Sequence, residues 1–239
     1  NITKWMSVTG RARLDNTVMN YTRKIYASSN KLYASEFGNY QDNTIMHNNF
    51  YGDILLTIDK KFVDDKLSLT ANLGASLVDD KNKASGFEGH LATVANKFSV
   101  YNISMTHSQT KPYADRWHDQ NQAVYGTLQL GWNGMVYVDG TVRNDWSSQL
   151  AFTPNQSVCY YSAGLSGVIS SMADLSGAGI SFLKVRGSYS TAGNPPQRFI
   201  TGVNTPLTVG GNISSDTYAP AKNLKPELTK SYEAGLNVK

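Results

Sequence analysis

The 239-residue chain has few of the residues from which disulfides, metal sites and membrane-spanning helices are built. Cys159 is its single cysteine, so neither a disulfide framework nor a cysteine-based zinc site can form within the chain. The four histidines stand at no metal-ligand spacing. No stretch approaches the roughly 18 consecutive apolar residues of a spanning helix, which excludes a helical membrane protein. We therefore expect no metal and no cofactor.

Charge is also scarce. Charged residues make up 17% of the chain, and 22 Lys and Arg against 18 Asp and Glu give a net charge of +4. The basic residues are scattered, which argues against a nucleic-acid partner. No charged segment followed by an apolar one opens the sequence, so we expect no signal peptide. The 14 Tyr, 8 Phe and 4 Trp exclude a disordered chain and indicate a folded domain.

A period of two dominates the sequence, and its clearest example is Leu67–Val78. Over these twelve positions, apolar side chains alternate with mostly polar ones, as they do in a strand with one apolar face. A strand in a globular domain usually has about five or six residues. A tilted strand needs roughly 9–11 residues to cross a bilayer, and this segment matches that length.

The same period, sometimes weaker, predicts about nine strands in all. The other eight are Met6–Leu14, Asn20–Ala27, Phe50–Lys60, Val124–Trp132, Val136–Arg143, Cys159–Ile169, Phe182–Thr191 and Thr229–Val238. Tight turns are expected at Asp15–Thr17, Val63–Lys66 and Asn133–Gly134. Long polar connections are expected at Ser28–Asn49, Asp79–Asn121, Asp145–Val158 and Ala192–Leu228. If all tight turns lie on one side and all long connections on the other, nine strands can alternate in direction only when Phe98–Thr106 is part of a loop and not a spanning strand. Short turns on one side and long loops on the other are typical of an outer-membrane barrel.

Charge placement supports lipid on the apolar side of these strands. A Lys or Arg facing lipid at the bilayer midplane costs about 2–4 kcal/mol. Lys60 is the exception, and it stands at a strand end, where its ammonium group can reach water. The charged residues on the polar side are Arg11, Arg13, Asp53, Asp59, Asp139, Arg143, Lys184, Arg186 and Glu233. A secreted or surface β-sandwich that binds carbohydrate would show the same alternation and remains an alternative.

No motif of an active site is present, so an enzyme is not expected. The segment Arg116-Trp117-His118-Asp119 is a candidate ligand contact, because aromatic faces and charged groups suit sugars and peptides. The alternative for this segment is an aromatic residue at a rim with solvated neighbours. Tyr160 and Tyr161 are expected in an aromatic girdle. The candidate ligand or lumen residues are Arg116, Trp117, Asp139, Arg143, Asp145, Trp146 and Arg186.

Three motifs between about Gln122 and Lys239 carry a family resemblance. A predicted strand ends in Arg143, Asn144, Asp145, Trp146, Ser147 and Ser148. Downstream, the segment Phe182–Tyr189 is followed by Gly193 and Asn194. The last motif joins Asn223, Leu224, Lys225, Pro226 and Glu227 to Ser231, Tyr232 and Glu233. In order and spacing these segments resemble the signatures of SusC/RagA-type TonB-dependent transporters.

The resemblance implies an all-β, antiparallel transmembrane barrel of about 22 strands with long extracellular loops. Residues 1–239 would form a partial barrel domain of about nine strands, with the plug and the remaining strands absent. The implied function is part of a nutrient importer in the outer membrane of a Gram-negative, Bacteroidetes-type bacterium, taking up glycans or oligopeptides. The implied partners are a SusD-like surface lipoprotein, TonB through parts outside this chain, and outer-membrane lipid.

Overall fold

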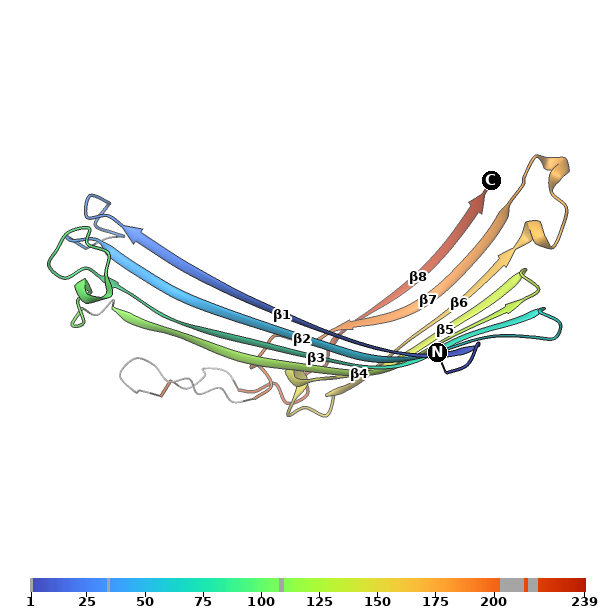
Figure 1. The fold of residues 1–239 in the computed structure, drawn as a ribbon, viewed down its shortest axis with the longest axis horizontal. Helices are drawn as coiled ribbons and strands as arrows, with labels where there is room; N and C mark the ends of the chain where they lie inside the picture. Colours follow the sequence, from blue (N-terminus) through green and yellow to red (C-terminus); the bar gives the residue numbers. More distant parts are fainter. Residues whose placement is uncertain (1, 34, 108–109, 203–212, 215–218) are drawn as a thin grey trace.

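The computed structural model describes residues 2–33, 35–107, 110–202, 213–214 and 219–239. In this part of the chain, eight strands form one antiparallel sheet in which each strand pairs with the next one in sequence, from β1 to β8. Figure 1 shows the sheet as a curved, open wall with β1 and β8 at its two edges. The prediction of an all-β antiparallel fold is confirmed.

The strands fall into two length classes. The first four have 20 to 24 residues and are β1 (Met6–Ile25), β2 (Asn39–Phe62), β3 (Leu67–His90) and β4 (Lys111–Trp132). The last four have 12 residues each and are β5 (Val136–Ser147), β6 (Ser157–Val168), β7 (Leu183–Asn194) and β8 (Glu227–Val238). Short 3-10 helices occupy Val100–Asn102, Ser148–Leu150, Ile169–Ser171 and Ser176–Ala178. At one end of the sheet the long strands therefore project well past the short ones (Figure 1).

The number of strands is eight rather than about nine, because the expected turn at Asp15–Thr17 was wrong. Strand β1 runs straight through these residues, and its Asp15 and Thr17 pair with Asn49 and His47 of β2. The expected loops Ser28–Asn49 and Asp79–Asn121 are also shorter than predicted, because the neighbouring strands extend into them. Their flanks continue β2, β3 and β4 as paired strands. These segments carry polar residues on both faces, so a periodicity argument cannot distinguish them from loops.

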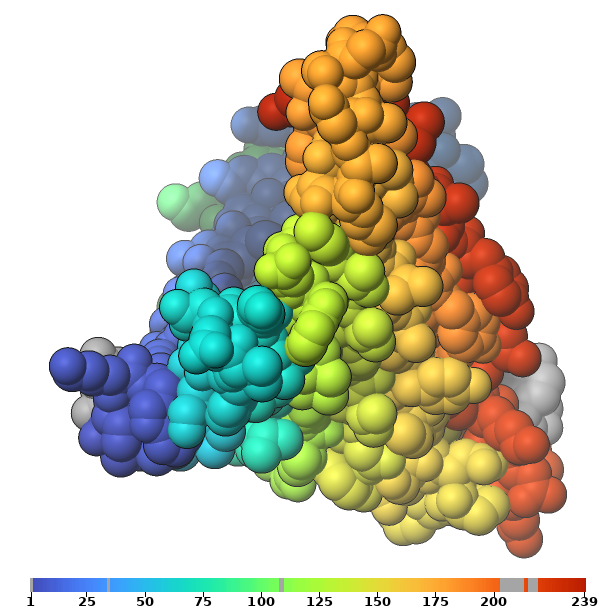
Figure 2. Space-filling model, turned by 90° about the vertical axis from the view of Figure 1, so that its right-hand side faces the viewer, coloured from blue at the N-terminus to red at the C-terminus, as the bar shows by residue number. Residues whose placement is uncertain are grey.

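The alternation of short and long connections holds only in part, because the β6–β7 connection on the short-turn side has 14 residues, more than the 13 between β1 and β2 or the 9 between β5 and β6. Short turns join β2 to β3 and β4 to β5, and in the latter Asn133 and Gly134 both have positive φ, 50° and 69°. Such angles suit the right-handed twist of a two-stranded hairpin. Figure 2 looks onto this end, with the β2–β3 turn in cyan, the β4–β5 turn in yellow-green and the β6–β7 connection in orange. Phe98–Thr106 lies in the β3–β4 connection and holds the helix Val100–Asn102, as its assignment to a loop required.

The connection between β6 and β7 is the longest on the short-turn side. The backbone N–H of Ser176 donates to the Asp174 carboxylate over 2.9 Å. Hydrogen bonds from the backbone and the hydroxyl of Ser176 hold the pKa of Asp174 below its usual value. The charged carboxylate thus stabilises the turn that precedes the helix Ser176–Ala178.

No second layer covers the apolar side of the sheet in the part of the chain that the structure describes. Leu73, Val138 and Leu236 are 59%, 50% and 63% exposed. The two largest fully buried side chains, Leu91 and Leu150, belong to the connections and not to the sheet. The β-sandwich alternative is therefore wrong, since a sandwich buries these positions against a second sheet. Among the residues described, no helix is long and apolar enough to cross a membrane.

Candidate functional site

The strand register separates the sheet into an apolar face and a polar face. The row Ile54, Ala75 and Val124 lies directly beside the row Asp53, Ser76 and Ala123, and alternation turns the two rows to opposite sides. The charged residues that the alternation assigned to the polar side of the strands all lie on this face, namely Arg11, Arg13, Asp53, Asp59, Asp139, Arg143, Lys184, Arg186 and Glu233. The polar face is thus the candidate functional surface.

Asp53 is the centre of the polar face on β1 and β2. Its side chain is fully buried by its neighbours, and it accepts from Nε and Nη2 of Arg11 at 2.9 and 2.6 Å. The Tyr51 hydroxyl donates to the same carboxylate over 2.6 Å. A carboxylate so fully engaged fixes the side chains around it and has little capacity left for a ligand. We therefore interpret this group as part of the wall.

A second polar network crosses β2, β3 and β4. The Thr57 hydroxyl donates to Asn72 over 2.8 Å, and the Asn72 amide donates to Thr127 over 3.0 Å. One row further, the Gln129 amide donates to Asp139 of β5 over 2.6 Å. Cross-strand pairs of this kind stabilise the sheet. The wall is therefore held together on its polar face by side chains as well as by backbone hydrogen bonds.

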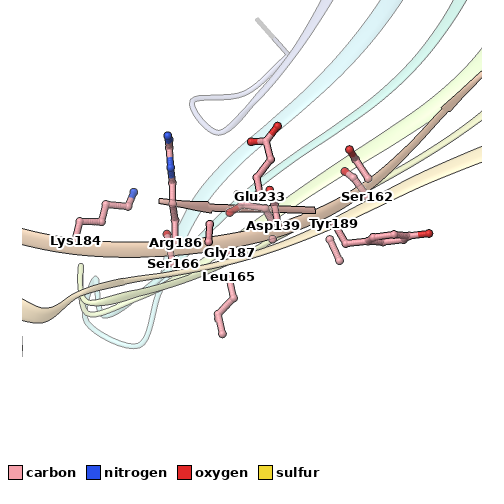
Figure 3. A pocket seen from close by; sticks show the side chains of 14 residues that line it. Asp139, Ser162, Leu165, Ser166, Lys184, Arg186, Gly187, Tyr189 and Glu233 are labelled. Carbon is pink, nitrogen blue, oxygen red and sulfur yellow. The ribbon is translucent and has the colours of Figure 1, made fainter. Parts of the chain in front are cut away.

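A polar groove of about 430 Å³ lies on the polar face of β5 to β8 (Figure 3). Figure 3 shows Lys184, Arg186 and Glu233 on one side of the sheet, while Leu165 points to the opposite side. Arg186 and Glu233 form no ion pair within the described residues. Together with Asp139, these side chains give the groove charges of both signs. Such a surface can bind a polar segment of protein or a polar solute.

The first family signature ends β5 and attaches the connection that follows. Arg143 donates to Asp145 over 2.6 Å on the polar face. Ser147 accepts from the N–H of Gln149, and Ser148 accepts from the N–H of Gln120 in β4 over 2.9 Å. The signature thus ties the β5–β6 connection to the neighbouring strand.

The structure brings the signature at Arg143–Ser148 close to the one that begins at Asn223, although some 80 residues separate Arg143 from Asn223 in sequence. The Asn155 amide donates to the carbonyl of Leu224 over 3.0 Å. Pro226 lines a cavity of about 170 Å³ together with Arg143, Asp145 and Tyr160. Tyr160 therefore lies on the polar face and not in a girdle, whereas Tyr161 lies on the apolar face as expected.

Trp146 was expected near the lumen, but the structure places it on the apolar face. It pairs with Gln122 and Ser157 in the row next to the apolar positions of β4 and β5. Strict alternation along β5 explains this position, because Arg143 and Asp145 face the polar side and the residues between and after them face away. Trp146 is thus placed to belong to an aromatic girdle.

The segment Arg116–Asp119 is part of β4 rather than of a loop, so its four side chains cannot form one cluster. Trp117 and Asp119 lie on the polar face, and Arg116 and His118 lie on the other. Arg198, from the β7–β8 connection, stacks on Trp117 with its guanidinium carbon 3.6 Å from the ring centroid and forms an ion pair with Asp119. Sequence analysis missed Arg198, because no periodicity marks a residue in a long connection.

Within the described residues, no group of three or more His, Cys, Asp or Glu side chains is arranged to hold a metal. The polar face therefore offers hydrogen bonds, charges and aromatic surface, which serve binding and guidance of polar molecules.

A family model for the β-barrel of TonB-dependent receptor-like proteins matches residues 3–239. The chain belongs to the TonB-dependent receptor β-barrel family. This membership places the chain in an outer-membrane barrel family rather than in an enzyme family, and it confirms that the resemblance found in the sequence is to TonB-dependent proteins. No curated protein matches the chain at a significant level.

Solved structures of other proteins share the fold of this chain. The RagAB peptide transporter matches with a TM-score of 0.75 and 19% identity, over 98% of this chain and 26% of its own. The closed-closed state of the RagAB peptide importer matches with a TM-score of 0.76 and 19% identity, over 99% of this chain and 26% of its own. The siderophore receptor PiuA from Acinetobacter baumannii matches with a TM-score of 0.52 and 12% identity, over 99% of this chain and 36% of its own. The chain thus spans about a quarter of the RagAB structures that it matches.

Proposed function

We propose that this chain is part of the barrel wall of a SusC/RagA-type importer, which takes up glycans or oligopeptides across the outer membrane. A SusD-like surface lipoprotein would capture the nutrient, and TonB would supply energy through parts outside residues 1–239. The family signatures at Arg143–Ser148 and Asn223–Glu227 support the SusC/RagA type, and so does the likeness in fold to the RagAB structures. RagAB is described as a peptide importer, which favours oligopeptides.

The observation that carries this proposal is the exposed apolar face opposite a continuous polar face. Soluble monomers seldom expose a contiguous apolar patch of more than a few hundred Å². Here exposed apolar side chains occur on every strand from Val8 of β1 to Leu236 of β8. Acyl chains are the cover that fits such a surface, and the polar face then looks into the lumen.

The two edges of the sheet point to a larger barrel. Among the described residues, strands β1 and β8 each have one unpaired edge, and backbone groups cannot stay unpaired in hydrocarbon. Further strands must therefore pair with both edges. We propose that residues 1–239 are a partial barrel domain, and the share of the RagAB structures that the chain covers supports this.

The polar groove, the smaller cavity beside Pro226 and the stacked pair of Trp117 and Arg198 are the proposed contacts of the lumen. Asp139 and Arg186 line the groove, and their charges suit either a plug surface or a passing peptide. Arg143 and Asp145 line the smaller cavity nearer the long connections. Trp117 offers an aromatic face on the same side of the sheet, beside Arg198.

Uptake by cells that carry the intact transporter tests the proposal. We expect deletion of the transporter to abolish uptake of a labelled oligopeptide or glycan mixture, and loss of TonB to have the same effect. Arg186→Gln should lower uptake at an unchanged amount of protein in the outer membrane. Lys230→Gln, on the apolar side of β8, is the matched control and should leave uptake unchanged. Undiminished uptake without the transporter or without TonB would contradict the proposal.

A further inference from the structure

Beyond the apolar band, the strands β3 and β4 sort their charges by sign. In sequence, acidic and basic residues are neighbours: Asp80 and Lys81, Asp115 and Arg116, His118 and Asp119. Because neighbouring residues of a strand face opposite ways, the three carboxylates fall on the polar face. Lys81, Lys83, Arg116 and His118 fall on the apolar side, and we call these four residues the basic patch.

The basic patch has little negative charge to balance it. Lys81 and His118 pair across the strands, and both contact the Asp79 carboxylate at 2.7 Å. Lys83 and Arg116 stand directly opposite one another, and neither forms an ion pair within the described residues. Like charges directly opposite each other destabilise a sheet. The arrangement therefore calls for an anion that the described residues do not supply.

The neighbouring strand does not supply the missing charge either. Met46 of β2 pairs with Lys83, and Asn48 pairs with Lys81. The nearest other carboxylate on this side is Asp42, which pairs with Phe87, four residues beyond Lys83. It already accepts from the hydroxyls of Tyr40 and Thr22.

The basic patch lies beyond the apolar band, within side-chain reach of the headgroup layer of a bilayer. The apolar positions of β3 run from Leu67 to Leu77, which is long enough to cross the hydrocarbon core. Lys81 and Lys83 follow Leu77 by four and six residues, or about 13 and 20 Å along the strand at roughly 3.3 Å per residue. With a strand tilt of about 45°, they stand roughly 9 and 14 Å above the apolar boundary. A long cationic side chain reaches back by roughly 6 Å, which brings the charged groups of Lys81 and Lys83 to about 3 and 8 Å above the apolar boundary, at the depth of a headgroup layer about 5–7 Å thick.

We propose that the basic patch binds the phosphate group of an anionic lipid in the outer leaflet, an inference that rests on the proposed orientation of the barrel in the membrane. The Arg116 guanidinium suits two phosphate oxygens at once, and the lysine ammonium groups act as point charges beside it. A lipid held there keeps its acyl chains against the exposed apolar positions below. The phosphate also removes the repulsion between Lys83 and Arg116.

The test is lipid binding by the purified intact transporter, which needs no transported substrate. The transporter is placed in phosphatidylcholine nanodiscs with increasing amounts of phosphatidic acid, and bound phosphatidic acid is counted by native mass spectrometry. We expect Lys83→Gln together with Arg116→Gln to weaken phosphatidic acid binding by about fivefold for each residue replaced. Lys31→Gln together with Lys97→Gln is the matched control, because it removes the same charge from exposed connections, and it should have no effect.

Thermal unfolding provides a second readout in the same nanodiscs. In phosphatidylcholine alone, the Lys83 and Arg116 double variant should unfold at or above the temperature of the unchanged protein, since a repulsion has been removed. With phosphatidic acid, only the unchanged protein and the control should gain stability. Equal lipid binding by both double variants would overturn the proposal. Displacement of the lipid by an equal concentration of inorganic phosphate would also overturn it, by showing a site for free phosphate. Neither result depends on uptake, so failure here is distinct from failure of the proposed function.

Discussion

The orientation of the two faces can be tested with one pair of neighbouring residues. Val142 and Thr141 are nearly isosteric, lie side by side in the middle of β5, and point to opposite faces of the sheet. Val142 is 57% exposed on the apolar face. Thr141 lies on the polar face between Asp139 and Arg143, and it pairs with Thr127. Replacement of each in turn by arginine places the same charge on either side of one strand.

The expected difference follows from the position of Val142 between the two ends of the apolar stretch. It stands six residues from Val136 and four from Trp146, close to the bilayer midplane. An arginine facing lipid at that depth costs about 2–4 kcal/mol. Thr141→Arg adds a charge to a wetted surface and should change stability by about 0.5 kcal/mol or less. The two variants should thus differ by about 1.5–4.5 kcal/mol, which is roughly 12- to 2,000-fold in the equilibrium constant for unfolding.

Urea unfolding of the intact transporter in phospholipid vesicles measures this difference. A third variant checks the dependence on depth: Val136→Arg, at the end of the strand beside Trp132, should cost only about 0–1 kcal/mol. If Thr141→Arg is as destabilising as Val142→Arg, lipid does not cover the apolar face. A cost at Val136 equal to that at Val142 would refute the depth argument alone.

Two further predictions concern the strand extension and the β7–β8 connection. Gly86→Ala should destabilise the part of β2 and β3 that projects past the short strands by about 1–3 kcal/mol, since a Cβ there would stand 2.2 Å from the backbone oxygen of Asp42. The control Gly140→Ala, where a Cβ would meet no atom within 4 Å, should cost nothing. Equal urea midpoints for the two variants would show that β2 and β3 can separate freely at Gly86. Arg198→Gln should release the β7–β8 connection from β4. Hydrogen exchange at the Ala221 amide, which donates to the carbonyl of Ile200, should then become about 5- to 30-fold faster. Unchanged exchange would mean that the stacking of Arg198 on Trp117 does not hold the connection.

How far the sequence predicts the fold depends on the solvent around each stretch of strand. Between Leu67 and Leu77, one face meets lipid and the other meets water, so alternation marks the strand clearly. From Asp79 on, neither face of β3 meets hydrocarbon, and the sequence Asp-Asp-Lys-Asn-Lys carries no apolar signal. The outer half of β1 was not predicted as part of one strand for the same reason, since it lacks an apolar face and Asp15 and Asn16 have the composition of a turn.

The candidate site was predictable to the extent that it lies on strands within the apolar band. Asp139 and Arg186 face the polar side as their position in the alternation predicted. Trp146 shows the limit of composition as a guide, because a tryptophan suits a lumen and a girdle equally and only the register decides. The stacking of Arg198 on Trp117 joins residues 81 positions apart, and no local pattern predicts such a contact.

One period of two serves two environments in this sheet. Within the bilayer, it separates apolar from polar side chains, and the free energy of lipid burial enforces the pattern. Above the apolar band, the same geometry separates Lys81 and Arg116 from Asp80 and Asp119, although neither face contacts hydrocarbon there. Water alone gives no reason for such a separation, since mixed charges on each face would repel less. The separation has a reason if the two faces contact different groups above the apolar band. In our proposal the basic face meets the lipid headgroups, while Asp119 of the acidic face forms an ion pair with Arg198 of the β7–β8 connection.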